Sequence, residues 1–314
     1  MGHDYSMKSN SNHLQQRLLR EELLSFIRQI CALHKFADFG KGMVINMFYH
    51  AKNGCLEMDN TTMDYLSFGA GEKHLIMIPG LGDGLKTVKG MAVPFAMMYK
   101  MFAKEYTIHV FSRKNELPQG YTTRDMATDV KHAMELCGIE RASVVGVSQG
   151  GMIAQHLAID YPEAVEKLAL IVTVPRKNEI IEQVISNWIT YAKEDKLHEI
   201  MQDMFQKMYT PEFIKKNPGM AALAERFSKP KSYDRFVIMA EACISHDAYD
   251  KLHMIKAPTL VIGGELDETV GAQPSRDIAE QIEQAELFMY AEYGHGLYEE
   301  AKDFNQRIYE FLEK

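Results

Sequence analysis

The sequence predicts an α/β fold in which helices cover both faces of a mostly parallel central sheet and an all-helical cap is inserted. Short apolar segments alternate with stretches of helical periodicity over residues 51–175 and again over residues 248–314. Strands separated by helices in this way are typical of a parallel sheet with both faces buried. Between these two parts, residues 176–247 show helical periodicity alone. We therefore expect a core made of two sequence segments with one helical cap, or lid, between them.

The expected strands are short apolar segments bounded by glycine, proline or helix signals. They are residues 63–68, 74–78, 106–111, 143–147, 168–172, 259–262 and 286–290. The expected helices are residues 86–103, a helix capped by Thr122 or Thr123, and residues 152–159, 274–283 and 298–313. This order of elements is the alternation from which the fold class is predicted.

The all-helical segment, residues 176–247, is expected to lie over the carboxyl ends of the strands. Within it, Thr210-Pro211 is typical of a helix start, and Asn217-Pro218-Gly219 is a helix breaker. Open α/β sheets bind their ligands at the carboxyl edge. A helical segment inserted between two strands of such a sheet therefore predicts a lid over a ligand site.

The beginning of the chain, residues 1–50, is predicted to be a helical extension. Residues 13–37 carry apolar side chains at helical spacing, with arginine and glutamate on the other side, which predicts an amphipathic helix. The mixed charge of its polar face favours packing on the protein over binding to a membrane surface. This helix and the lid are the candidate surfaces for a homodimer.

Composition and charge exclude several classes of protein. Of the 314 residues, 46% are hydrophobic and 25% are charged, which excludes a disordered or fibrous chain. The net charge is −8 without a basic stripe, so nucleic acid is not an expected partner. No apolar run approaches the ~20 residues that span a bilayer, and no signal-peptide pattern is found, so we expect a cytoplasmic location. No metal or cofactor is expected, because no Cys-x-x-Cys pair occurs among Cys31, Cys55, Cys137 and Cys243.

The clearest chemical signal is Gly146-Val147-Ser148-Gln149-Gly150, at the junction of an apolar strand and a helix. Gly-x-Ser-x-Gly in this setting predicts a nucleophile elbow. The turn is so tight that Gly146 and Gly150 must be small, and Ser148 is expected to adopt a strained backbone conformation that exposes its hydroxyl. The alternative is an ordinary glycine-rich turn between a strand and a helix.

An elbow serine needs a histidine as base and an acid that orients it, and in this arrangement they follow in the order Ser, acid, His. Asp267 and His295 each follow a predicted strand, so they are expected at the same sheet edge as Ser148. Glu265 and Glu268 are rival acids, but they resemble solvated loop carboxylates. The sequence therefore predicts a triad of Ser148, Asp267 and His295.

A glycine-rich loop, Pro79-Gly80-Leu81-Gly82-Asp83-Gly84, follows the strand at residues 74–78. Its glycines let a backbone N–H approach a substrate oxygen, which predicts an oxyanion hole from the N–H groups of Leu81 and Gln149. A bulky residue at Gly82 is expected to crowd this approach or to forbid a positive φ. The alternative is an NADP-binding βαβ unit ending in Ser112-Arg113-Lys114. Its spacing is not Gly-x-Gly-x-x-Gly, and it leaves the triad unexplained.

From about Asn53 to the C-terminus the chain resembles the α/β-hydrolase superfamily in its capped form. Residues 146–155 are similar to the elbow of the enol-lactonase, haloperoxidase-like and esterase branch, and residues 257–267 and Gly294-His295 match the family's acid and histidine segments. The resemblance implies an eight-stranded core with a helical lid. It also implies Ser148 as nucleophile, Asp267 as orienting acid and His295 as base.

Two segments depart from the family pattern. Pro79-Gly80 stands where the family often has His-Gly, and Ser112-Arg113-Lys114-Asn115 replaces a frequent Asp-x-Arg-Gly-x-Gly run. The triad is unaffected by these departures. They leave the branch of the superfamily open.

The predicted function is a serine hydrolase that cleaves an ester, lactone or thioester bond of a small substrate through an acyl-enzyme. The methionine and aromatic content of the lid predicts an adaptable apolar pocket. Arg176, Lys177 and the Arg113-Lys114 pair are candidate carboxylate anchors at its rim. An acyltransferase or C–C bond hydrolase with the same triad, and a non-catalytic ligand-binding protein of the same fold, stay open as alternatives.

Overall fold

A computed structural model describes residues 48–314, and at their centre lies an eight-stranded sheet. The strands are β1 (Lys52–Met58), β2 (Thr61–Phe68), β3 (Lys73–Ile78), β4 (Tyr106–Lys114), β5 (Ala142–Val147), β6 (Val165–Ile171), β7 (Thr259–Gly264) and β8 (Ala285–Tyr290). Their order in the sheet is β1-β2-β4-β3-β5-β6-β7-β8. β2 pairs antiparallel with both β1 and β4, and all other neighbours pair in parallel. The predicted mostly parallel α/β sheet is confirmed.

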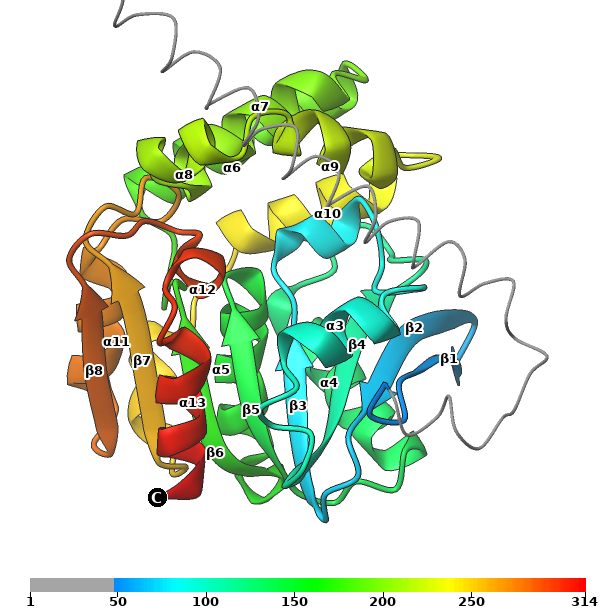
Figure 1. The fold of residues 1–314 in the computed structure, drawn as a ribbon, viewed down its shortest axis with the longest axis vertical. Helices are drawn as coiled ribbons and strands as arrows, with labels where there is room; N and C mark the ends of the chain where they lie inside the picture. Colours follow the sequence, from blue (N-terminus) through cyan, green and yellow to red (C-terminus); the bar gives the residue numbers. More distant parts are fainter. Residues whose placement is uncertain (1–47) are drawn as a thin grey trace, which may run out of the picture. The chain divides into compact units, whose positions relative to one another are not determined.

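Helices cover both faces of this sheet (Figure 1). One face carries α3 (Ala92–Met98) and α13 (Phe304–Glu313), and the other carries α4 (Thr123–Leu136), α5 (Gln149–Asp160) and α11 (Gln273–Gln281). Side chains of β3 alternate between the two hydrophobic cores, with Leu75 and Met77 in one and Ile76 and Ile78 in the other. Successive residues of a strand point to opposite faces, so a strand buried on both sides is apolar throughout.

The segment expected to form a lid folds as a group of helices at the carboxyl ends of the parallel strands, and these helices are called the lid below (Figure 1). It consists of α6 (Glu179–Lys193), α7 (Leu197–Met208), α8 (Pro211–Lys216), α9 (Met220–Ser228) and α10 (Asp234–Ile244). Helix α8 begins as the sequence predicts, because the Thr210 side chain accepts a hydrogen bond from the Phe213 N–H and Pro211 is the first helical residue. All of these helices fall within residues 176–247.

Some elements differ from the expectation. Strand β1 was not among the expected strands, since most of its residues are exposed or half-buried and it lacks an apolar pattern. The helix expected over residues 86–103 is shorter, because Gly90 adopts a φ of 83° before α3 begins. The helix expected over residues 298–313 is broken into α12 (Leu297–Glu300) and α13, since Ala301 is extended with a ψ of 116°.

Two further findings concern helix starts and the limits of the description. Thr122 caps α4 in a capping box with Asp125, which decides between the two expected caps. The amphipathic helix expected over residues 13–37 lies outside the described residues. Within residues 48–314, no helix has both the length and the apolar character needed to cross a membrane.

Candidate active site

Ser148 lies at the sharp turn between β5 and α5. Its φ of 54° and ψ of −119° place it in a region that L-residues rarely adopt. A Cβ atom built on Gly150 would lie 1.9 Å from the carbonyl oxygen of Ile78, and one on Gly146 would lie 2.4 Å from the carbonyl oxygen of Gly150. No side chain fits at either position. The glycines therefore permit the turn that holds Ser148 at the sheet edge.

A chain of hydrogen bonds joins Ser148, His295 and Asp267. The Nε2 atom of His295 lies 3.0 Å from Oγ of Ser148, and its Nδ1 atom lies 2.8 Å from Oδ2 of Asp267. The other carboxylate oxygen of Asp267 accepts the N–H groups of Thr269 at 2.8 Å and Val270 at 2.9 Å. With Oδ1 occupied by these donors, Oδ2 faces the imidazole. Nδ1–H then donates to Asp267, and Nε2 is left as the acceptor for the serine proton.

The rival acids of the sequence, Glu265 and Glu268, lie elsewhere. Glu265 is exposed and pairs with Arg276 at 2.5 Å, and Glu268 is exposed on the same loop. Asp267 between them is buried. Within this short loop, one carboxylate thus faces His295 and the other two are exposed to solvent.

Two backbone N–H groups are available beside Ser148. Leu81 is the first residue of the 3-10 turn η1 (Leu81–Gly84), and Gln149 is the first residue of α5. The first N–H groups of a helix have no carbonyl partner within it. A Cβ built on Gly80 would lie 3.4 Å from Cβ of Ser148, so the backbone of this loop passes close to the serine. Both N–H groups thus belong to segments that meet at Ser148.

Of the two effects expected of a bulky residue at Gly82, the structure contradicts only the backbone strain. No atom lies within 4 Å of a Cβ built there, and its φ is outside the left-handed region. Gly82 instead lines the cavity beside Ser148. A side chain at this position is therefore not expected to strain the loop, and crowding of the approach to Ser148 stays a prediction.

The cavity beside Ser148, called the Ser148 cavity below, has a volume of about 200 Å³. Lid helices α6, α7 and α10 form much of its wall. Its apolar lining residues are Leu81, Met152, Ile181, Ile185, Trp188, Met204, Met208, Cys243 and Val270. Thr269, Tyr298 and Asp83 are the polar lining residues besides Ser148 and His295. Among the described residues that line the cavity, none is a lysine or an arginine.

Arg113 lies behind the loop that carries Leu81, not at a pocket rim. Its side chain is 2% exposed, and Nη2 donates to the carbonyl oxygen of Pro79 at 2.5 Å and to Oε1 of Gln149 at 3.1 Å. Burial lowers the pKa of Arg113 to about 10. Lys114 pairs with Asp129 at 2.7 Å. The expectation of a carboxylate anchor at these two residues was therefore wrong.

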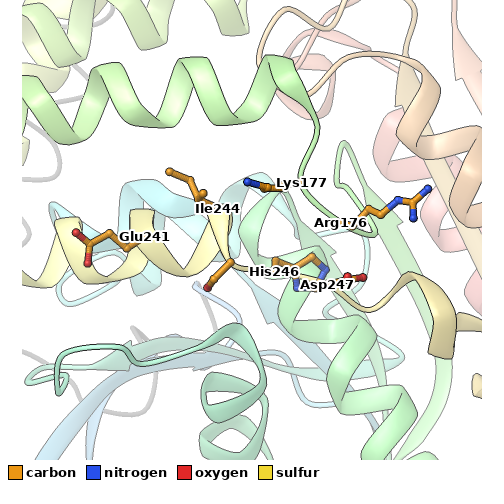
Figure 2. A pocket seen from close by; sticks show the side chains of 7 residues that line it. Arg176, Lys177, Glu241, Ile244, His246 and Asp247 are labelled. Atoms are coloured by element: carbon orange, nitrogen blue, oxygen red, sulfur yellow. The ribbon is translucent and has the colours of Figure 1, made fainter.

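Arg176 and Lys177 line a different pocket, of about 480 Å³, where the lid joins the core. This hinge pocket shares no lining residue with the Ser148 cavity. Figure 2 shows the Arg176 side chain pointing away from Lys177. Arg176 stacks 4.1 Å above the Tyr249 ring, and Lys177 pairs with Glu182 at 2.8 Å. The expected anchoring role of these two cations beside Ser148 is thus contradicted by their positions.

Two residues of the site carry no signal in the sequence. Asp83 and Arg235 form an ion pair of 2.5 Å between η1 and lid helix α10. They are 152 residues apart, and only the placement of α10 brings them together. A charged residue on a lid helix is most simply taken for a surface residue, so the pair was not predicted.

The mostly parallel sheet, with the serine, histidine and aspartate hydrogen-bonded at the carboxyl ends of its strands, is the arrangement of an α/β protein of the hydrolase class. The model of the alpha/beta hydrolase fold family matches residues 73–302. The chain therefore belongs to the α/β-hydrolase family, as the resemblance implied.

Individual relatives agree with this family. The 3-oxoadipate enol-lactonase 2 of Acinetobacter baylyi is 25% identical over 240 residues, which are 76% of this chain and 88% of that protein. The 2-hydroxy-6-oxononadienedioate/2-hydroxy-6-oxononatrienedioate hydrolase of a Pseudomonas species is 27% identical over 221 residues, which are 67% and 74% of the two chains. The enol-lactonase structure from Burkholderia xenovorans has a TM-score of 0.71 at 21% identity and covers 83% of this chain and 100% of that chain. These relatives are hydrolases, and the present chain is an enzyme of the α/β-hydrolase type.

Proposed function

We propose that the protein is a serine hydrolase that cleaves an ester-like bond, of an ester, lactone or thioester, in a small apolar substrate through an acyl-enzyme. The observation that carries this proposal is the unbroken chain from Ser148 Oγ to His295 and Asp267, at 3.0 and 2.8 Å, beside an apolar cavity. A serine, a base and an orienting acid in this geometry are the elements of nucleophilic acyl transfer.

In the first half-reaction, Nε2 of His295 takes the proton of Ser148 while Oγ attacks the substrate carbonyl carbon. Asp267 holds the imidazole tautomer and stabilises the imidazolium that forms. The negative charge on the carbonyl oxygen is stabilised by the N–H groups of Leu81 and Gln149. The tetrahedral intermediate then expels the alcohol or thiol, which receives the proton from His295, and the acyl-enzyme is left.

In the second half-reaction, His295 takes a proton from water, which attacks the acyl carbon. The same N–H groups stabilise the second oxyanion. Collapse of this intermediate releases the carboxylic acid and returns the proton from His295 to Ser148. No group outside the described site is required for the proton balance.

The lining of the Ser148 cavity supports an uncharged substrate. The names of two relatives denote carboxylates, an adipate and dioates, whereas no lysine or arginine lies among the described lining residues of this cavity. Burying a carboxylate without a partner is costly. A volume of about 200 Å³ is also below the roughly 300–1,000 Å³ of pockets for drug-sized ligands, so a short acyl group fits best.

C–C bond hydrolysis is a second candidate, because the relative of 27% identity is named for the hydrolysis of 2-hydroxy-6-oxo dienedioates. The two functions differ in substrate charge and in the bond that is broken. Parallel assays with nitrophenyl acetate or butyrate and with a 2-hydroxy-6-oxo-dienoate, which carries one carboxylate, distinguish them. We expect turnover of the esters.

The nucleophile is tested with a fluorophosphonate probe, which reacts with activated serines. We expect the wild-type protein to be labelled at Ser148 and the Ser148→Ala variant to be neither labelled nor active on nitrophenyl esters. Peptide mapping by mass spectrometry locates the label. Labelling of a different serine, or full activity in Ser148→Ala, contradicts the proposed mechanism.

A further inference from the structure

Lid helix α10 directs the guanidinium of Arg235 towards η1 and the end of β4. Its Nη2 donates to Oδ2 of Asp83 at 2.5 Å and to the carbonyl oxygen of Arg113 at 3.0 Å. Its Nε donates to the carbonyl oxygen of Lys114 at 2.8 Å, and its Nη1 donates to the carbonyl oxygen of Asp83. All three guanidinium nitrogens are therefore used, and every acceptor lies in η1 or at the end of β4.

The acceptor carboxylate is itself fixed in place. The Asp83 side chain is 1% exposed, and its Oδ2 also accepts the backbone N–H of Arg113 at 2.9 Å. Asp83 is the third residue of η1, the turn that begins with the N–H of Leu81. The ion pair thus ties the lid to the turn that supplies one oxyanion donor.

Helix α10 also touches this region without charges. A Cβ built on Gly84 would lie 2.9 Å from Cα of Phe236, so the backbones of η1 and α10 are in direct contact. On the other side of the proposed oxyanion hole, Nε2 of Gln149 donates to the carbonyl oxygen of Met239 at 2.6 Å. The same lid helix therefore contacts both segments that carry the proposed oxyanion donors.

The donors of an oxyanion hole must lie about 2.7–3.1 Å from the oxygen that becomes charged. A misplacement of about 1 Å can cost roughly 100-fold in rate. The turn Gly80-Leu81-Gly82-Asp83-Gly84 is rich in glycine, which restrains its own backbone weakly. The rigid fork of an arginine, bound to a carboxylate and to carbonyl oxygens, supplies the missing restraint.

We propose that Arg235 is a positioning residue that, through Asp83, holds the Leu81 N–H in place, so that the lid completes the oxyanion hole. The inference rests on the proposed serine-hydrolase function. It assigns the lid a part in the chemical step in addition to its part in enclosing the substrate. The oxyanion exists only during the reaction, so the loss of Arg235 must lower kcat and leave substrate binding almost unchanged.

The test measures kcat and KM of Arg235→Met on a short nitrophenyl ester at a temperature where the variant is folded by circular dichroism. We expect kcat to fall about 10- to 100-fold while KM stays within about threefold. Arg235→Lys restores one charged hydrogen bond without the fork, so its kcat is expected between those of the wild type and Arg235→Met. A boronic acid, which forms a tetrahedral adduct with the serine, is expected to bind Arg235→Met more weakly by a similar factor.

Arg124→Met is the matched control. Arg124 pairs with Asp160 at 2.7 Å, away from the turn, so its loss is expected to leave kcat unchanged. If Arg235→Met does not fold, Asp83→Asn removes the same ion pair from the other side and must give the same fall in kcat. Wild-type kcat in either folded variant, or an effect on KM alone, overturns the inference. Failure of the wild-type enzyme itself to react with the fluorophosphonate would instead reject the serine-hydrolase proposal.

Discussion

The Asp267 carboxylate uses its two oxygens for different purposes. Oδ1 accepts two backbone N–H groups from its own loop, and Oδ2 accepts the Nδ1–H of His295. The loop therefore fixes the carboxylate, and the carboxylate fixes the tautomer of the histidine. With Nδ1 protonated, Nε2 is free to accept the proton of Ser148, 3.0 Å away.

Asp267→Asn tests this dependence at the scale of one residue. The variant keeps the size of the side chain, but its NH₂ group can donate to Nδ1 and so favour the tautomer that carries its proton on Nε2. We expect kcat on a nitrophenyl ester to fall by about 10⁴, in line with the loss seen when an orienting acid becomes an amide. The melting temperature checks that the fold is retained. Activity within about tenfold of wild type would contradict the assignment of Asp267 as the orienting acid.

Residues of the site differ in how visible they are in the sequence. Ser148, Asp267 and His295 each stand beside a local signal, a Gly-x-Ser-x-Gly turn or the end of an apolar strand, so they were predicted together. Arg113 was expected at the pocket rim because a charged residue near the end of a strand is normally exposed. In the structure its guanidinium is buried, where Pro79 and Gln149 provide hydrogen-bond acceptors. Long-range partners of this kind leave no trace in spacing or periodicity.

At the scale of elements, lid helix α7 contributes Met204 and Met208 to the wall of the Ser148 cavity. Met204 of α7 lines the cavity, whereas Met201, one turn earlier, is partly buried and does not line it. Each methylene that a substrate buries is worth about 0.8 kcal/mol, or roughly fourfold in kcat/KM, until the cavity is full. A cavity of about 200 Å³ is expected to fill after a few carbons.

Met204→Ala is therefore expected to move the optimum in a series of nitrophenyl esters, from acetate to octanoate, towards longer acyl chains. Met201→Ala is the matched control on the same helix and is expected to keep the wild-type optimum. Both truncations remove apolar contacts and are expected to lower the stability, by about 2–5 kcal/mol where the side chain is fully buried. The assay is made well below both melting temperatures. An unchanged optimum in Met204→Ala would mean that α7 does not limit the acyl site.

Elements with a strong local pattern were predicted, and those without one were not. The expected strands are all present, and most of them carry a continuous apolar run or end at a glycine or proline. Strand β1 escaped detection, since it is an edge strand that pairs only with β2 and exposes most of its side chains. Helix bounds were less accurate near Gly90 and Ala301, where the local backbone conformation ends the helical pattern.

At the scale of the whole molecule, several histidines are buried where protonation is unfavourable. Burial lowers the pKa of His109 to about 4, with His74 contributing, and burial lowers the pKa of His156 to about 4. Burial also lowers the pKa of His246 well below its ordinary value. In the unfolded chain these groups titrate near ~6.5. Between about pH 6.5 and 4 the unfolded state therefore binds more protons than the native state.

The free energy of unfolding must then fall as the pH falls through this window, by up to about 1.4 kcal/mol per pH unit for each such histidine. His109→Leu removes one of them. The two ring nitrogens of His109 have no hydrogen-bond partner among the described residues, so an apolar replacement leaves no new polar group unpaired. We expect the variant to lose less stability than the wild type between pH 6.5 and 4.5, measured by urea unfolding at each pH.

His198→Gln is the control for this titration. His198 is exposed, and its pKa is raised by the hydrogen bond to Glu225. A raised pKa in the native state contributes stability that is present at low pH and is lost as the pH rises, the opposite sign to His109. Removing His198 is therefore not expected to reduce the fall in the free energy of unfolding between pH 6.5 and 4.5. If His109→Leu and the wild type lose stability in parallel from pH 6.5 to 4.5, protonation of buried His109 does not contribute to acid unfolding of this protein.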